Sequence, residues 1–202
     1  MARHNPRITP LPMSEWGDKE KEALSVFVKP GGKSVQGGDG NKSKDMSALA
    51  IFLNHPGLAK AIFPLTRHLL YDNLLPGRDR ELLVLRVAWL RQSDYEWTQH
   101  VIIARNKGVT DEEIRRVGHG EVSPDWSARD KLLMRAVGEL FESACLSDAT
   151  WGGLEEYYSE QELMEVVITV GAYDLIAMAF NSFGLQTGEE LKAVLAQFPL
   201  TD

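Results

Sequence analysis

Cysteine is almost missing from this sequence, which has a single one, Cys145, among its 202 residues. One thiol excludes a disulfide within the chain, and it excludes the Cys-x-x-Cys pair that many redox and metal sites use. Histidine is scarce as well. Its five residues are scattered, and none has another histidine three or four positions away. A site with two histidine ligands on one helix is therefore not predicted.

Long apolar runs are also missing. The longest, such as Val166–Val170 and Ile176–Phe180, are much shorter than the roughly 20 residues that span a bilayer. The basic N-terminal stretch lacks the apolar segment of a secretory signal. A net charge of −7 argues against a surface for nucleic acid or for an anionic membrane. We expect a cytoplasmic protein whose partner is a small-molecule substrate, with no nucleic acid and no membrane bound.

Helical signals dominate the sequence, and strand signals are weak. Thr110 and Glu113 have the spacing of a capping box, while Gly108 and Gly184 stand where helices end. The predicted fold class is therefore all-α. Helices are predicted at about 13–28, 47–54, 57–73, 78–92, 94–107, 111–117, 127–145, 148–158, 160–182 and 188–197.

The segment 29–46 is rich in glycine, serine and lysine, which predicts a loop. It divides the chain into an N-terminal extension, residues 1–46, and a helical domain, residues 47–202.

The helical domain contains an internal sequence repeat. The stretch 80–100 can be aligned with 161–181, so that Glu81 meets Glu162 and apolar positions meet apolar positions. Two copies of one helical unit that share a core would produce this pattern. The second copy has Ala177 where the first has Glu96, so any chemistry is expected in the first copy.

Four polar side chains stand out in the first copy: Glu81, Ser93, Glu96 and His100. Glu96 and His100 lie four residues apart in "YEWTQH", which places them on one side of a helix. A carboxylate in a partly apolar pocket has a raised pKa, and a carboxylate bonded to His100 would fix the imidazole tautomer. Such a set can move protons to and from a carbon acid without a cofactor.

Simpler explanations exist for the same residues. Ser93 as N-cap and Glu96 three positions later have the spacing of a capping box, and His100 could be an ordinary core histidine. Alternatively, Glu96 and His100 could supply two ligands to a metal, with Glu81 as a third. Because the histidines are scattered, we predict no metal.

The run "LLPGRDRELLVLRVAWLRQSDYEWTQHVIIARNKGVTDEEIRRV" (74–117) resembles the carboxymuconolactone decarboxylase family, which includes the AhpD-like peroxidases. The resemblance covers about 47–185 and is strongest over 76–114. It implies an all-helical fold of repeated units, and homo-oligomers that are trimers or hexamers. In the AhpD-like branch a Glu, a Cys-x-x-Cys pair and a His form a thiol redox site.

Carried onto this sequence, that Glu matches Glu81, that His matches His100, and the two cysteine positions fall on Ser93 and Glu96. Neither side chain can form a disulfide, so a dithiol peroxidase mechanism is excluded. The resemblance points instead to the decarboxylase branch, which acts on lactone acids of aromatic catabolism and needs no cofactor.

On this basis we predict a cofactor-independent lyase. His100 is expected to donate the proton, Glu96 to orient His100, and Glu81 to complete the relay. Ser93, Tyr95 and Arg86 are candidates for binding the substrate. The alternative is a non-catalytic oligomer of the same fold that binds a ligand related to aromatic compounds.

Overall fold

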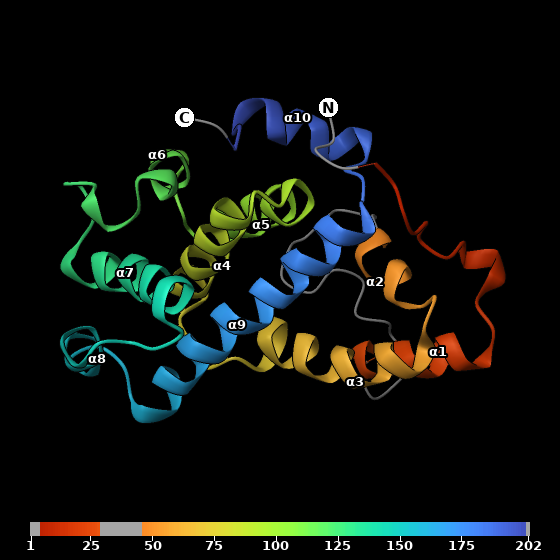
Figure 1. The fold of residues 1–202 in the computed structure, drawn as a ribbon, viewed down its shortest axis with the longest axis horizontal. Coiled ribbons are helices and arrows are strands. Elements are labelled where there is room, and N and C mark those ends of the chain that lie inside the picture. The colour runs from red at the N-terminus through yellow and green to blue at the C-terminus, as the bar shows by residue number, and fades with distance from the viewer. Residues whose placement is uncertain (1–4, 29–45, 201–202) are drawn as a thin grey trace.

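The computed structural model describes residues 5–28 and 46–200, and it is built from helices (Figure 1). The described residues contain no β-strand, which confirms the all-α prediction. The α-helices are α1 (Asp18–Leu24), α2 (Ser47–Phe52), α3 (Pro56–Arg67), α4 (Gly77–Arg91), α5 (Asp94–Asn106), α6 (Asp111–Arg116), α7 (Ala128–Ser143), α8 (Asp148–Glu155), α9 (Glu160–Phe183) and α10 (Glu189–Gln197). Short helices lie at Met13–Glu15, Ser25–Phe27 and Val117–Val122, and a π-helix follows α3 at His68–Asp72.

The predicted helix ends agree with the structure at most places. Thr110 and Glu113 form the expected capping box, and Gly108 and Gly184 have the positive φ angles of helix ends. The predicted helix over 13–28 is instead three short pieces, because the chain is extended at Trp16 and Gly17. The loop predicted over 29–46 lies almost wholly outside the described residues.

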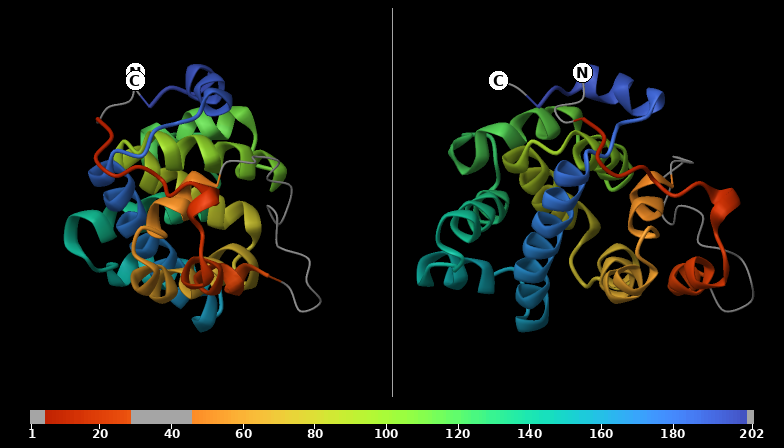
Figure 2. Two further views of the ribbon diagram at one scale, coloured as in Figure 1. Left: turned by 90° about the vertical axis from the view of Figure 1, so that its right-hand side faces the viewer. Right: turned by 45° about the vertical axis from the view of Figure 1, so that its right-hand side comes forward.

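Helix α4 lies at the centre of the fold. It packs against α5, α7 and α9, and α9 crosses the middle of the molecule (Figures 1 and 2). The sequence of α4 explains this position, since seven consecutive side chains from Asp79 to Leu85 are buried. Burial on every face of a helix is expected only where neighbours surround it. The buried charged residues of α4, which are Asp79, Arg80 and Glu81, therefore need partners inside the protein.

The N-terminal extension is attached to both ends of the helical domain. Helix α1 packs on α3, and the backbone N–H groups of Arg7 and Ile8 donate to the carbonyl of Phe183 at 2.9 and 3.0 Å. The described part of the extension thus belongs to the same folded body.

By length and composition alone, α9 could cross a membrane. Its contacts favour the core of a folded domain, since it packs along α4 and its two internal acids are paired. Glu165 binds His68 at 2.7 Å, and Asp174 forms an ion pair with Arg91.

The internal repeat is visible in α4 and the first half of α9, which are long helices packed against each other. The two stretches differ after that point. α4 ends at Gln92, which has a positive φ, and α5 begins anew, whereas α9 continues without a break to Phe183. Only the first copy therefore has a helical hairpin.

Gly184 provides a test of how the extension is attached. It has a φ of +69°, and a Cβ there would collide with the carbonyl oxygen of Asn5. We expect Gly184→Ala to lower the free energy of unfolding by roughly 1–3 kcal/mol. Gly138 lies in α7 with open space around it, so Gly138→Ala should instead stabilise by about 0.5–1 kcal/mol. Urea unfolding of both variants measures this, and equal effects would contradict the described contact.

Candidate active site

Glu81 and His100 meet inside the protein, as the sequence predicted. Glu81 lies in α4 and His100 in α5, and the tight connection through Gln92 and Ser93 brings the two helices side by side. The Glu81 Oε2 lies 2.7 Å from the His100 Nδ1. Glu81 is fully buried, and His100 is 7% exposed. We call these two residues the Glu81–His100 pair.

Arg80, which the sequence analysis did not select, binds the other oxygen of Glu81. Its Nε and Nη2 donate to Oε1 at 2.9 and 2.8 Å. Its Nη1 donates to the carbonyls of Leu69 and Leu70 in the π-helix. A helix end leaves carbonyls without partners, and the guanidinium satisfies two of them here. Every nitrogen of Arg80 is thus engaged in holding Glu81 in place.

The charges around Glu81 decide its protonation state. Burial alone would raise the pKa of the Glu81 carboxyl, but His100 and Arg80 outweigh it through charge and hydrogen bonds, so this pKa is lowered. Glu81 is therefore a carboxylate at neutral pH. Because a carboxylate only accepts hydrogen bonds, the His100 Nδ1 must carry the proton that joins the pair. In this tautomer the Nε2 of His100 is the ring nitrogen that does not bond to Glu81.

Tyr173 of α9 packs against His100. The two rings meet edge to face, with centroids 4.9 Å apart and an interplanar angle of 86°. Tyr173 is buried, and this burial, with the nearby charge of Glu81, raises the pKa of its hydroxyl. The hydroxyl is therefore protonated at any physiological pH, and the tyrosine ring fixes the plane of the imidazole.

Glu96 has a different position from the one predicted. We expected it to orient His100, but Glu81 bonds to His100 instead. Both carboxyl oxygens of Glu96 are buried, and neither has a hydrogen-bond partner in the part of the chain that the structure describes. The Ser93 Oγ is also buried and without a partner. Ser93 is the N-cap of α5, yet its side chain makes no capping bond. The capping-box explanation of these two residues is therefore wrong.

Burial sets the protonation state of Glu96. It raises the pKa of the Glu96 carboxyl well above its ordinary value, and the negative charge of Asp174 raises it further. The N-terminus of α5 favours a carboxylate by about 1 kcal/mol at most positions, whereas burying an unpaired charge costs several kcal/mol. Glu96 is thus a neutral carboxylic acid, whereas Glu81 is ionised.

Arg86 and Tyr95 are engaged elsewhere. Arg86 donates to the carbonyls of Val117 and Gly118, both at 2.9 Å, because its position in α4 directs it toward the short helix 117–122. These bonds tie Arg86 to the short helix 117–122, and substrate binding by Arg86 stays a prediction. Tyr95 packs against Phe180, and its hydroxyl accepts from the backbone N–H of Ala48 at 3.3 Å. These contacts join α5 to α2 and α9.

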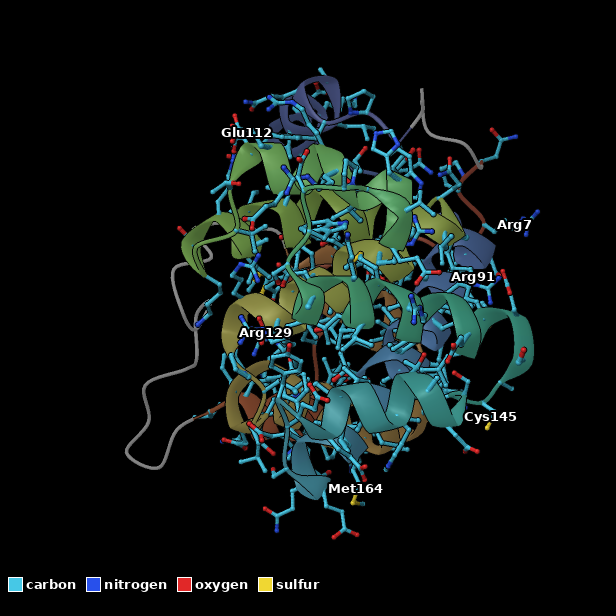
Figure 3. All side chains as sticks on the ribbon, turned by 90° about the vertical axis from the view of Figure 1, so that its left-hand side faces the viewer. Arg7, Arg91, Glu112, Arg129, Cys145 and Met164 are labelled. Atoms are coloured by element: carbon cyan, nitrogen blue, oxygen red, sulfur yellow. The ribbon has the colours of Figure 1, made fainter. Side chains whose placement is uncertain are left out.

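The lone thiol lies on the surface. Cys145 is exposed just after α7, at the edge of the molecule (Figure 3). Within residues 5–28 and 46–200, no three His, Cys, Asp or Glu side chains are grouped in a way that could hold a metal ion.

Residues 56–138 match the model of the carboxymuconolactone decarboxylase family. This finding confirms the resemblance seen in the sequence, and the matched range contains Glu81, Ser93, Glu96 and His100. No curated protein sequence matches the chain.

Solved structures share the fold. The debrominase Bmp8 superposes with a TM-score of 0.74 at 14% identity, and the match covers 96% of this chain and 98% of Bmp8. A peroxidase-related protein with an alkylhydroperoxidase AhpD core from Ralstonia eutropha gives 0.72 at 16%, covering 93% and 96%. A peroxidase-related protein from Silicibacter gives 0.70 at 13%, covering 94% and 97%. At such low identities these matches show an AhpD-like helical fold and nothing finer.

The state of Glu96 can be tested through stability. Its carboxyl pKa is raised in the folded protein from an ordinary 4.5. The folded state therefore keeps a proton that the unfolded state loses, and the stabilising contribution falls as pH rises above 4.5. We expect the free energy of unfolding of the wild type, relative to Glu96→Gln, to fall by up to about 1.4 kcal/mol per pH unit in this range. The exposed Glu112→Gln serves as control, and parallel pH curves for wild type and Glu96→Gln would contradict the assignment.

Proposed function

We propose, from the match of residues 56–138 to the model of the carboxymuconolactone decarboxylase family, that the protein is a cofactor-independent lyase. Its proposed reaction is the decarboxylation of a carboxymuconolactone-like lactone acid, or of a related oxo-acid, from aromatic catabolism. A cytoplasmic location goes with this proposal, since such acids are intermediates of metabolism inside the cell.

The observation that carries the proposal is the buried Glu81–His100 pair. The carboxylate holds the Nδ1–H of His100 at 2.7 Å, and Arg80 holds the carboxylate. This arrangement fixes the imidazole tautomer and leaves Nε2 as the atom that gives or takes a proton. An imidazole that is positioned in this way is suited to protonate carbon near neutral pH.

The proposed reaction balances with these groups alone. The bond between the substrate carbon and its carboxylate breaks, CO₂ leaves, and the electron pair moves into the conjugated carbonyl to give an enolate. The carbon then takes a proton from the Nε2–H of the His100 imidazolium, and solvent returns that proton. Glu81 stays ionised throughout and stabilises the imidazolium. No oxidant or reductant is needed.

Thiol chemistry does not fit this chain, although two of the solved structures of the same fold are described as peroxidase-related. The family positions that hold a Cys-x-x-Cys pair are Ser93 and Glu96 here. Cys145 is single and exposed, outside α4 and α5 (Figure 3). A disulfide cycle within one chain requires a second thiol.

We further propose that the protein is a homo-oligomer, either a trimer or a hexamer. One face of α9 carries the exposed apolar side chains Met164, Ile168, Leu175 and Met178, which we call the α9 face. With Gly171 between them, they follow one another at steps of four, three, four and three residues, the spacing of a helix–helix seam. Met164 projects from the outer edge of the molecule (Figure 3). A second copy would remove this apolar stripe from water.

The catalytic proposal predicts that His100→Ala lowers the rate of CO₂ release from carboxymuconolactone by about 100-fold or more, because the proton donor is lost. Glu81→Gln should also lower the rate, since the glutamine cannot stabilise the imidazolium. His119→Ala is the matched control, because His119 is exposed and should leave the rate unchanged.

A His100→Ala variant as active as the wild type would remove His100 from the mechanism. Wild-type protein that gains thermal stability with the lactone acid but releases no CO₂ would instead favour the non-catalytic binding protein.

The assembly proposal is tested with Leu175→Glu, which places a charge in the α9 face. We expect sedimentation to show a trimer or hexamer for the wild type and a smaller species for this variant. Val122→Glu changes an exposed apolar residue outside α9 and should leave the assembly intact. A monomeric wild type at micromolar concentration would contradict the proposal.

A further inference from the structure

Two polar side chains of the site, Ser93 and Glu96, have no hydrogen-bond partner among residues 5–28 and 46–200. The Ser93 Oγ and both Glu96 oxygens are buried without a hydrogen bond, and the residues are 0% and 2% exposed. Buried polar groups are almost always paired, and an unpaired one costs about 1–3 kcal/mol. Such a cost is tolerated mainly where the group has a task.

The two side chains belong together. Ser93 is the N-cap of α5 and Glu96 stands three positions later, so the two side chains lie on the same side of this helix. Glu96 also lies one turn before His100. Resting on the proposed function, we propose that Ser93 and Glu96 form the site for the uncharged carbonyl oxygen of a lactone ring, with Glu96 as the acid that donates a hydrogen bond to it.

The charge of the surroundings supports an uncharged acceptor. Two groups on α9 interact electrostatically with Glu96, namely Tyr173 and Asp174. Asp174 is paired with Arg91, and four of the five N–H donors of Arg80 bond to Glu81 and to the carbonyls of Leu69 and Leu70. The charge that acts on Glu96 is thus the negative one of Asp174, which disfavours a second carboxylate at this place. A carbonyl oxygen, in contrast, needs a donor, and a protonated carboxyl and a hydroxyl each supply one.

This arrangement divides the proton chemistry between two groups. When the bond to CO₂ breaks, negative charge develops on the lactone carbonyl oxygen, and the Glu96 O–H stabilises it by a hydrogen bond or gives it the proton. His100 then protonates the carbon, and the enol oxygen returns its proton to Glu96. The net change is one proton consumed and one CO₂ released. Glu96 would thus be a catalytic acid, in contrast to the orienting role that the sequence suggested.

Infrared difference spectroscopy of the full chain tests this assignment without depending on turnover. The protein is labelled at its glutamate carboxyl carbons and measured at neutral pH. The wild type should show a protonated carboxyl band that is absent in Glu96→Gln and present in Glu112→Gln. Addition of γ-crotonolactone, an uncharged lactone, should shift this band and move the lactone carbonyl to lower frequency, but only when Glu96 is present.

Ser93→Ala should weaken the binding of the same lactone up to about tenfold, through the loss of one hydrogen bond. If the wild type decarboxylates carboxymuconolactone, Glu96→Gln should lower kcat by roughly 100-fold with little change in KM. An ionised Glu96 at neutral pH, or a carboxyl band unchanged by the lactone, overturns the proposal. Lactone binding at Glu96 without any decarboxylation would refute the proposed reaction, but it would still support the proposed lactone-binding site.

Discussion

The fold and its site depend on one constraint, which is a carboxylate placed where water cannot reach it. Glu81 lies in α4, whose neighbours cover it on every side, and a buried charge without partners costs several kcal/mol. Arg80 and His100 bind its two oxygens and remove most of that cost. To do so they must come from fixed positions, so the connection to α5 and the π-helix before α4 become parts of the site.

Much of the fold could be predicted from the sequence, because its helix ends carry local signals. The capping box of Thr110 and the glycines that end α5 and α9 depend only on nearby residues. The first helix was predicted too long, since the extended backbone at Trp16 interrupts it. The match of 80–100 with 161–181 predicted two related helices, but periodicity alone could not show that only the first copy breaks at Gln92.

The sequence predicted some residues of the site, whereas the roles of the others became clear only from the structure. The partnership of Glu81 and His100 came from their family positions, and the structure joins them. The role of Glu96 was misassigned, because four residues on a helix place two side chains near each other without deciding which carboxylate takes the hydrogen bond. Tyr173 was missed because it contacts His100 from a segment distant in the sequence. Arg80 directly precedes Glu81, but the sequence does not show that its side chain turns to the Glu81 carboxylate and to the carbonyls of Leu69 and Leu70.

The proposed site depends on the direction of one hydrogen bond, from the Nδ1–H of His100 to an ionised Glu81. Nitrogen NMR of histidine-labelled protein at neutral pH measures it directly, with the His100 signal assigned by its loss in His100→Gln. We predict a protonated Nδ1 with a strongly deshielded proton that moves upfield in Glu81→Gln. An unprotonated Nδ1, or a signal that Glu81→Gln leaves unchanged, would contradict the account.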